Sequence, residues 1–532
     1  MLIERLPSGM ENAEVLIARR ARAAKIKEQW RSIYSDCYRY AMPARETFTW
    51  DASAEGQQKS NVLYDSTLQE ATYTAANTLI ALLFPSWARW AELAPGGAIP
   101  EEALTPDIIV GLQKATKTFF DFLNSSNFPT VIGEVSLDLM VGTAAMAFDE
   151  GDSNEKPFVF SSLPLSAVEI EEGPDGSIEN HYMLRKPKAR HLQRLYPGLE
   201  LFDLSPKTQD LIQDEMKAET EVPVIQCELY SPETKHYYGV VIELEAKQIV
   251  WRFDYGKSCP KIVARATKVA GETFGRGRVM LALADAKTLD KMQEFTLRHA
   301  ALQIAPPMTG VSDGVLNPYT ASLTPNTIIP VASNDNGSPS LRALELGGNF
   351  NISEIMMSDL RQRVRRTMIG PEPSEGAVKS ATEIDISDRN RLWAMNGEYN
   401  RIQAELLAKI VARGVFILQK KGLMPKFEVD GREVSVKYTS PFAKSQASED
   451  VMNLQEALAV SSAAGPEVLS LAVKVEDIPA YVWRLKGVPE KLLRSEEEKQ
   501  EIKDQIQQGM QAQQQAQQAA AEGGVEAPQV GQ

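Results

Sequence analysis

One helical pattern is too long for an ordinary compact domain, and it constrains the fold more than any other feature of the sequence. Apolar residues recur every three or four positions between Ser380 and Lys420, which is the period of an α-helix. These residues are Leu392, Met395, Tyr399, Ile402, Leu406 and Ile410. Ser380-Ala381-Thr382-Glu383 is a capping box that predicts the start of the helix, and Gly422 predicts its end. A straight helix of this length spans about 60 Å, and a kink is expected at its glycines, Gly397 and Gly414.

A short acidic loop separates this helix from a second one. Pro371 to Lys379 contains two prolines, a glycine and two glutamates, and the prolines prevent a helix from continuing across it. The preceding helix is expected from Asn351, with Glu354 at the capping-box position. Its apolar face consists of Met357, Leu360, Val364 and Met368.

Four arginines lie in the C-terminal half of this second helix: Arg361, Arg363, Arg365 and Arg366. Two interpretations are open. The cations compensate the helix dipole and are otherwise solvated, or they contact a phosphate backbone or the carboxylates of a neighbouring subunit.

A third long helix is predicted from Arg276 to Gln303, about 40 Å in length, and Pro306-Pro307 ends it. Its apolar stripe contains Leu281, Ala284, Thr288, Met292, Phe295, His299 and Leu302. A charged row lies about 100° around the axis and contains Lys287, Lys291, Glu294 and Arg298. His299 is interpreted as a packed histidine on the stripe.

The first 265 residues are predicted to form an α+β body. Helical patterns cover residues 10–40, 65–83, 105–124 and 131–147, and the second of them stops at Phe84-Pro85. Residues 156–265 alternate and contain β-branched and aromatic residues. Two strands are expected around the turn Gly173-Pro174-Asp175-Gly176, and two or three more in residues 228–254.

The remaining segments are shorter or less regular. Residues 304–347 hold turn residues and short strand-like runs such as Asn326–Val331. A hairpin around Asp430-Gly431 is expected over Phe427–Tyr438. Residues 447–508 are predicted to be helical, and residues 509–532 form a low-complexity tail.

Composition narrows the functional class. The chain has 532 residues and a formal net charge of -14, which argues against a protein that grips duplex DNA by neutralising phosphates. No run of 18 apolar residues occurs, and the N-terminus lacks the pattern of a signal peptide. We therefore expect no membrane association. The three cysteines, Cys37, Cys227 and Cys259, fit reduced thiols.

No motif predicts an enzyme, a metal site or a cofactor. Gly275-Arg276-Gly277-Arg278 precedes a helix but lacks the residues of a phosphate-binding loop. It is interpreted as a structural turn, with contact of its arginines to a nucleic-acid backbone as the alternative. The four histidines, His181, His191, His236 and His299, lack metal-ligand spacing. We predict no catalytic residues, no metal and no cofactor.

Taken in order, five segments resemble the portal proteins of short-tailed, T7-like bacteriophages, which are head-to-tail connectors. The segments are NVLYDSTLQEATYTAANTLIALLFPSWARWAEL, GETFGRGRVMLALADAKTLDKMQEFTLRHAALQIAPP, VSDGVLNP, SATEIDISDRN and LKGVPEKLLRSEEEKQEIKDQIQQ. The resemblance covers most of residues 10–510.

The resemblance implies a phage portal fold, α+β but mostly α, assembled as a ring of twelve subunits. Its parts would be a wing (1–275), stem helices (276–303 and 350–369), a clip (304–349), a tunnel loop (370–380), a long wing helix with a hairpin (381–440), a helical crown (441–508) and the tail (509–532). The tunnel loop would place Glu372, Glu375 and Lys379 toward DNA in the channel. The alternative is that this loop is a plain surface connection.

The implied partners are those of a portal vertex. They are double-stranded DNA bound without sequence specificity, the terminase large subunit, the tail adaptor and nozzle, the major capsid and scaffolding proteins, and internal core proteins. The expected location is the virion, and the host cytoplasm during assembly. Two other functions compete with this one. A packaging ATPase or nuclease would need a phosphate-binding loop that the sequence lacks, and a helical scaffold or filament protein would form no closed ring.

Overall fold

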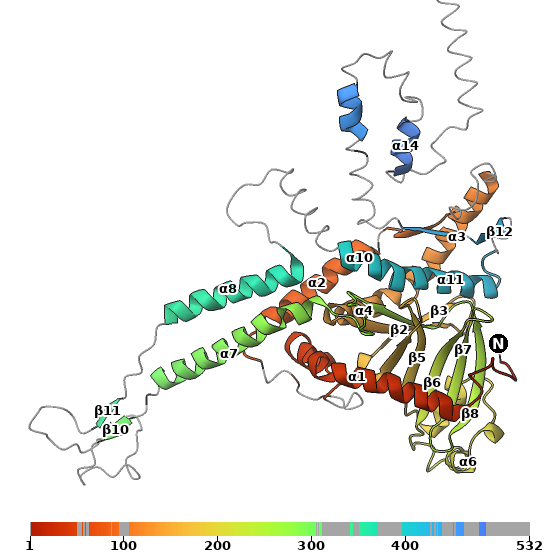
Figure 1. The fold of residues 1–532 in the computed structure, drawn as a ribbon, viewed down its shortest axis with the longest axis horizontal. Coiled ribbons are helices and arrows are strands. Elements are labelled where there is room, and N and C mark those ends of the chain that lie inside the picture. Colours follow the sequence, from red (N-terminus) through yellow and green to blue (C-terminus); the bar gives the residue numbers. More distant parts are fainter. Residues whose placement is uncertain are drawn as a thin grey trace, which may run out of the picture. The chain divides into compact units, whose positions relative to one another are not determined.

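Two antiparallel sheets lie at the centre of the N-terminal part of the chain (Figure 1). The structure, a computed structural model, describes residues 2–49, 56, 59, 63–86, 88–94, 106–304, 306, 308–310, 341–343, 350–370, 396–425, 428–429, 432–433, 435–438, 451, 454–461 and 478–485. The chain divides into two compact units, Met1–Tyr438 and Thr439–Gln532.

The larger sheet has five strands in the order β4-β5-β6-β7-β8, each antiparallel to its neighbour. The strands are β4 (Val168–Glu172), β5 (Ile178–Arg185), β6 (Val224–Ser231), β7 (His236–Glu243) and β8 (Gln248–Gly256). The predicted turn joins β4 to β5, and the Gly173 N–H donates to the Ser177 carbonyl at 2.9 Å. The strands expected in residues 156–265 are therefore confirmed.

Both faces of this sheet are covered. Helix α1 (Ala13–Ala41) places Leu16 and Ala23 against Ile225 on one face. On the other face Val224 packs against a helical insertion between β5 and β6, because neighbouring residues of a strand point to opposite sides. The insertion contains η4 (Ala189–His191), α5 (Leu192–Leu195), η5 (Leu201–Asp203) and α6 (Pro206–Gln213).

The smaller sheet has the order β3-β2-β9 and corrects one prediction. Its strands are β2 (Thr143–Glu150), β3 (Phe158–Leu163) and β9 (Lys261–Arg265), and its helical neighbours include α3 (Pro106–Ser125) and α4 (Phe128–Val141). The helix expected over residues 131–147 is wrong beyond Val141. Residues 143–148 are all buried in the central strand, and a short buried strand has the same apolar character as a buried helix.

Helices α7 (Arg278–Ile304) and α8 (Phe350–Ile369) lie side by side and extend away from the sheets (Figure 1). They run antiparallel, because Arg278 contacts Met368 while Leu289 packs near Met357. The strands β10 (Met308–Gly310) and β11 (Leu341–Ala343) pair beyond their far ends. Helix α2 (Thr67–Leu83) packs against both helices and against α4. Both long helices are confirmed within two residues of their predicted bounds.

The described part of the longest helix consists of α10 (Asn396–Ile402), a π-helical turn (Gln403–Leu407) and α11 (Ala408–Lys420). Its predicted stripe is confirmed at Tyr399, Ile402, Leu406 and Ile410, which are all buried. The irregularity lies in the π turn, between the two glycines where kinks were predicted. The predicted start of the helix, residues 380–395, is outside the described residues.

The hairpin predicted after this helix is only partly correct. Strands β12 (Glu428–Val429) and β13 (Arg432–Glu433) pair around Asp430-Gly431. The next strand, β14 (Ser435–Tyr438), pairs with β1 (Ala91–Ala94) instead. That partner is distant in the sequence, and local turn signals carry no information about such pairing.

The C-terminal unit is described at two helices, residues 454–461 and α14 (Ile478–Leu485). Both fall inside the region predicted to be helical. The strand-like run Asn326–Val331 and the tail are outside the described residues.

Two further 3-10 helices, η1 (Pro43–Arg45) and η3 (Leu165–Ala167), complete the described elements. None of the helices that the structure describes is long and apolar enough to cross a membrane.

The Gly-Arg-Gly segment before α7 is packed backbone to backbone against the junction of α4 and β2. A Cβ atom on Gly277 would overlap the carbonyl oxygen of Met140, and one on Gly275 would overlap that of Gly142. The Gly275 N–H donates to Thr143 Oγ1 at 2.8 Å. Glycine is needed here because two chain segments approach more closely than any side chain allows.

We expect Gly277→Ala to destabilise the protein by about 1–3 kcal/mol, because the added methyl group forces this junction apart. Gly133→Ala is the matched control, since it lies inside α4 with no heavy atom within 4 Å of the added Cβ. The control should stabilise the protein by about 0.5–1 kcal/mol. Urea unfolding of the two variants and the parent measures both effects, and equal stability of Gly277→Ala and the parent would contradict the prediction.

Candidate assembly surface on helices α7 and α8

Helices α7 and α8 bury a narrow apolar seam between them. Leu289 of α7 packs against Met357 and Leu360 of α8, and all three side chains are buried. The apolar face predicted for α8 is confirmed, because Met357, Leu360, Val364 and Met368 are all buried. The seam occupies one side of each helix, so each keeps an outer face.

Arg278, the first residue of α7, connects three helices. Its Nε donates to Glu398 of α10 at 2.9 Å, and its Nη1 donates to the carbonyl oxygen of Met368 in α8 at 2.9 Å. Both charged side chains are largely buried. The last carbonyls of a helix lack intrahelical donors and favour a nearby cation. One guanidinium therefore satisfies the end of α8 and binds α10 at the same time.

A second cluster of polar contacts joins both helices to the segment before α2. The Asp290 carboxylate accepts hydrogen bonds from the backbone N–H groups of Tyr64 at 2.6 Å and Asp65 at 3.1 Å. Asp65 accepts from Nε and Nη2 of Arg361 at 3.1 and 2.9 Å. Arg361 also donates to Gln293 at 3.4 Å. Two sets of polar contacts therefore hold the helix pair to the body. One is formed by Arg278 at the start of α7, and the other by Asp290, Asp65 and Arg361 near the middle of the pair.

The four arginines of α8 differ in their surroundings. Arg361 pairs with Asp65 within the subunit, and its side chain is 34% exposed. Arg363 forms an exposed pair with Asp359 one turn away, at 3.0 Å. Arg365 and Arg366 are exposed. The sequence pattern does not separate these cases, because the four residues share one charge and one helix.

The predicted charged row of α7 is present and is partly paired within the subunit. Lys287 binds Asp36 of α1 at 2.6 Å. Lys291 binds Glu294 at 2.6 Å, and Arg298 pairs with the same carboxylate. The side chains of Lys291 and Arg298 nevertheless remain 58% and 67% exposed, so both keep N–H donors that can meet another molecule.

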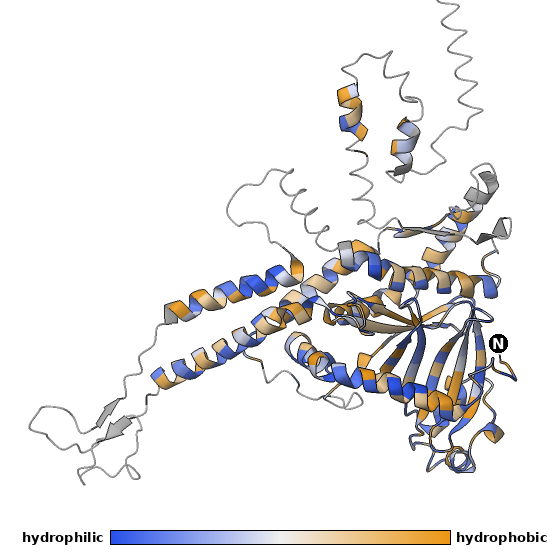
Figure 2. Cartoon of the chain, viewed as in Figure 1, coloured by the Kyte–Doolittle hydropathy of each residue, from blue (hydrophilic) through white to orange (hydrophobic). Residues whose placement is uncertain are grey.

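Most of the predicted apolar stripe of α7 faces outward, away from α8, but Met292 is partly buried and packs against the seam between the two helices. Leu281 is 73% exposed and Phe295 is 56% exposed, and Leu302 and Ile304 are also exposed. The buried face lies on the opposite side and contains Val279, Ala282, Leu283, Ala286 and Leu289. His299, interpreted from the sequence as packed, is partly buried. Figure 2 shows apolar positions along both helices, outside the body of the fold.

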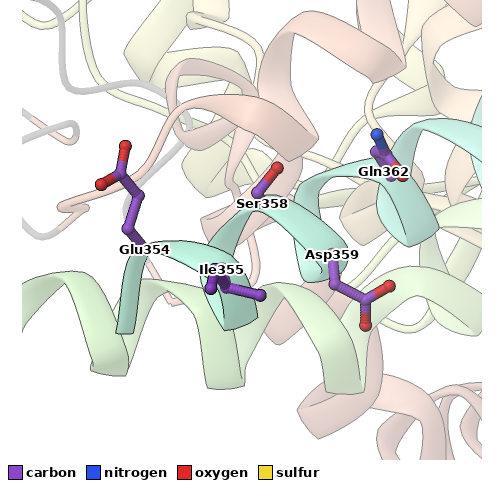
Figure 3. Close-up of a pocket in the computed structure, with 5 residues that line it drawn as sticks. All are labelled: Glu354, Ile355, Ser358, Asp359 and Gln362. Atoms are coloured by element: carbon purple, nitrogen blue, oxygen red, sulfur yellow. The ribbon is translucent and has the colours of Figure 1, made fainter. Parts of the chain in front are cut away.

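Helix α8 also has an exposed apolar group, beside a hollow. Ile352, Ile355 and Met356 are exposed, with Ile355 at 69%. The hollow is lined by Glu354, Ile355, Ser358, Asp359 and Gln362 (Figure 3). All five belong to α8, so the hollow is a shallow groove along one helix and has no second wall.

No group of three His, Cys, Asp or Glu residues could hold a metal ion in the described part of the chain. Burial lowers the pKa of His181 to about 3 and raises that of Cys259 to about 12, so neither is ionised at neutral pH. The Gly-Arg-Gly segment is occupied by protein contacts, and Arg276 pairs with Glu272 at 2.6 Å. The segment therefore has a structural role, as interpreted from the sequence, but Arg276 forms an antiparallel β-bridge with Thr267 and not a turn.

The predicted channel residues Glu372, Glu375 and Lys379 are outside the described residues. The contacts that anchor the helix pair, at Asp65, Asp290 and Glu398, were not identified from the sequence. Asp65 belongs to the Asp-Ser-Thr segment that supported the resemblance, so a signal was present at that position.

The candidate assembly surface lies within a sequence that matches a family model. Residues 13–493 match the sequence model of a family described as bacteriophage head to tail connecting protein. The chain belongs to this family of phage head-to-tail connecting proteins. The family is a structural one, and membership places this connector in the virion, at the junction of head and tail.

No curated protein matches the connector. It is similar to a chain in the neck of an empty gene transfer agent (GTA) particle computed with C6 symmetry, at 10% identity and a TM-score of 0.35, over 74% of this chain and 86% of the other. It is also similar to a chain in the virion of a native GTA particle, at 11% identity and a TM-score of 0.31, over 76% and 90%.

We expect Arg278→Gln to destabilise the connector by about 3–5 kcal/mol, because it leaves the Glu398 carboxylate largely buried without its cation. Arg276→Gln is the control, since its pair with Glu272 is more exposed and lies within one segment. That change should cost about 1 kcal/mol or less. Urea unfolding at neutral pH measures the difference, and equal losses would show that Arg278 has no special role.

The stability contributed by Asp65 should depend on pH. Burial raises the pKa of Asp65, but hydrogen bonds from Thr67 and the ion pair with Arg361 outweigh it and leave the pKa below its ordinary value. A carboxyl group with a depressed folded pKa stabilises the fold above its unfolded pKa of about 3.9. This stabilisation is lost as the pH falls through the folded pKa.

We therefore expect Asp65→Asn to lower the unfolding free energy by about 1–3 kcal/mol at pH 7, with the difference from the parent shrinking below about pH 4. Glu28→Gln is the control, because its pair with Arg31 is exposed and should matter little at any pH. Chemical unfolding at several pH values tests this, and a pH-independent effect of Asp65→Asn would refute it.

Proposed function

We propose that this connector is the portal subunit of a short-tailed, T7-like phage, and that it assembles into a closed ring around a channel for double-stranded DNA. The observation that carries the proposal is the outward position of the apolar stripe on α7. A monomer would leave Leu281, Phe295 and Leu302 in water, next to the exposed isoleucines of α8. Extended apolar surface of this kind is typical of an interaction site.

The contacts that anchor the two helices favour the interpretation that they form a subunit interface and not a mobile arm. Arg278 and Asp290 bind α7 to its surroundings through buried contacts, so the helix pair is already positioned before any partner is present. A surface that is ordered in advance loses less entropy on association. Cyclic contacts between identical subunits are the usual way to bury such surfaces, and they close when the rotation allows it.

Within this proposal the parts of the chain take the roles expected from the resemblance. Residues 1–275 and 381–440 form the wing, α7 and α8 the stem, 304–349 the clip and 441–508 the crown, in a ring of twelve. The clip binds the terminase large subunit during packaging and the tail adaptor and nozzle afterward. The capsid, scaffolding and internal core proteins contact the remaining surfaces.

The proposed tunnel loop, residues 370–380, acts mechanically on DNA. Glu372 and Glu375 have the same charge sign as the phosphates and reduce tight binding, while Lys379 adds a weak attraction. Arg365 and Arg366, which are exposed on α8, are further candidates for contact with DNA or with a neighbouring subunit. This arrangement would guide sliding DNA without holding it.

Purified connector should form a ring with a central opening, with a particle mass that is a multiple of 58.8 kDa. We expect Leu281→Asp to weaken assembly at least about tenfold in protein concentration, because it removes apolar burial at the contact and adds a charge. Leu195→Asp, at an exposed position on α5, should assemble like the parent. Native mass spectrometry and electron microscopy of particles measure these outcomes.

Two results would oppose the proposed function. A particle mass of one subunit at every protein concentration would show that no ring forms. Open filaments would favour the alternative that the protein is a scaffold or filament protein. Circular dichroism of Leu281→Asp confirms that its fold is intact, since the residue lies outside the buried face of α7.

A further inference from the structure

We infer that the outer face of α7 in one subunit seats on the hollow of α8 in the next copy of this chain, with Phe295 against Ile355 and with Lys291 and Arg298 facing Asp359 and Glu354. The inference rests on the proposed function and names which surfaces meet. The occupant of the hollow is thus a second copy, and the contact joins two different surfaces.

The chemistry of the two faces is complementary. The α7 face presents the exposed ring of Phe295 between two exposed cations, and Lys291 Nζ lies 5.1 Å from the ring centroid. The α8 face presents the exposed Ile355 between two carboxylates in a hollow that has only one wall (Figure 3). An apolar centre flanked by opposite charges is the pattern of a specific interface, with the charges selecting the register.

The levels of these residues along the helices also agree. Within one subunit Leu289 packs against Met357 and Leu360, and Gln293 receives a hydrogen bond from Arg361. Leu289 is therefore level with the α8 segment 357–360. Two residues further along α7, Lys291 is level with the segment 355–358, which adjoins Asp359. The helices are antiparallel, so the next turns of α7, with Phe295 and Arg298, are level with the preceding turn of α8.

Rotation about a symmetry axis does not change height along that axis. For helices that run along the axis of a ring, a residue therefore meets a neighbour's residue at the level it already has within its own subunit. At 1.5 Å per residue, Lys291 is then within about 6 Å in height of the next subunit's Asp359, and Phe295 is within about 6 Å of its Ile355. Arg298 is about 5–9 Å from the level of Glu354, a distance that the two long side chains can span. Because the two faces come from different helices, the contact is head-to-tail and not that of a two-fold dimer, and it closes into a ring when the rotation between subunits allows it.

Charge exchange tests this pairing. The variant K291E/R298E places acid against acid at every contact, and E354K/D359K places base against base. Each alone should require at least about tenfold more protein to assemble than the parent. An equal mixture of the two should assemble again, because every contact then joins an acidic face to a basic one. The mixed rings should contain both variants in equal number.

R22E/K25E on the exposed side of α1 is the control, because it changes the net charge as much as K291E/R298E does but lies elsewhere. It should assemble like the parent. Recovery in the mixture also shows that neither variant is unfolded. If both variants assemble alone like the parent, or if the mixture stays unassembled, this pairing is wrong while the ring itself stands. If the parent forms no ring, the proposed function fails first.

A cysteine pair tests the register directly. In the F295C/I355C variant, mild oxidation should link neighbouring subunits and give a ladder of multimers on a non-reducing gel. The single variants F295C and I355C should give no ladder. A product that runs only as a monomer would mean that α7 and α8 of neighbouring subunits do not meet at these positions.

Discussion

The hydrogen bonds of Arg278 position the helix pair α7 and α8, which carries the exposed apolar residues of the proposed subunit interface. Its guanidinium donates one hydrogen bond to the Met368 carbonyl at the end of α8 and another to the Glu398 carboxylate near the start of the described α10. Removing a charge from water is costly, and the cost is offset only when carboxylate and carbonyl acceptors surround it. The contact is therefore directional, and it defines where α7 leaves the body, where α8 returns and where α10 begins.

Buried charge is used in the same way elsewhere in the N-terminal unit. Arg265 of β9 is fully buried between Glu405 of the π-helical turn and Glu172 of β4. Its backbone N–H also donates to Glu405 at 2.9 Å. The two sheets and the long helix thus share one ionic cluster. Pairs of this kind add less to stability than apolar packing of equal volume, but they tolerate few alternative arrangements. We interpret the cluster as what sets the register of the long helix on the sheets.

The outer faces of α7 and α8 have the opposite character. They are apolar or charged and largely exposed. Arg278 anchors the start of α7, and Asp290 anchors the helix near its middle. A rigid arm with an unburied apolar stripe is unfavourable for a monomer and suited to a repeated assembly. Membership in the head-to-tail connecting family is compatible with the proposed assembly.

The sequence alone determined the long helices of this protein and the buried apolar face of α8. The period of apolar residues located α7, α8 and the described end of the longest helix within a few residues, and the same period grouped Met357, Leu360, Val364 and Met368 on one buried face. These features are local, because the side-chain direction of a helix repeats every 3.6 residues whatever surrounds it. The order of the five segments that resemble portal proteins also came from the sequence, and the family match agrees with it at the level of a head-to-tail connector.

The tertiary structure decided which apolar stripe is buried and which charges are paired. Leu281 and Leu289 are both apolar residues of α7, yet only Leu289 is buried, because α8 covers one side of the helix. Arg361 and Arg365 are alike in sequence, but only Arg361 reaches Asp65, nearly 300 residues away in the chain. The strand that follows Gly142 and the pairing of β14 with β1 were likewise decided by contacts with segments that are distant in the sequence. Burial and pairing depend on distant segments, and the local pattern of a chain does not contain their positions.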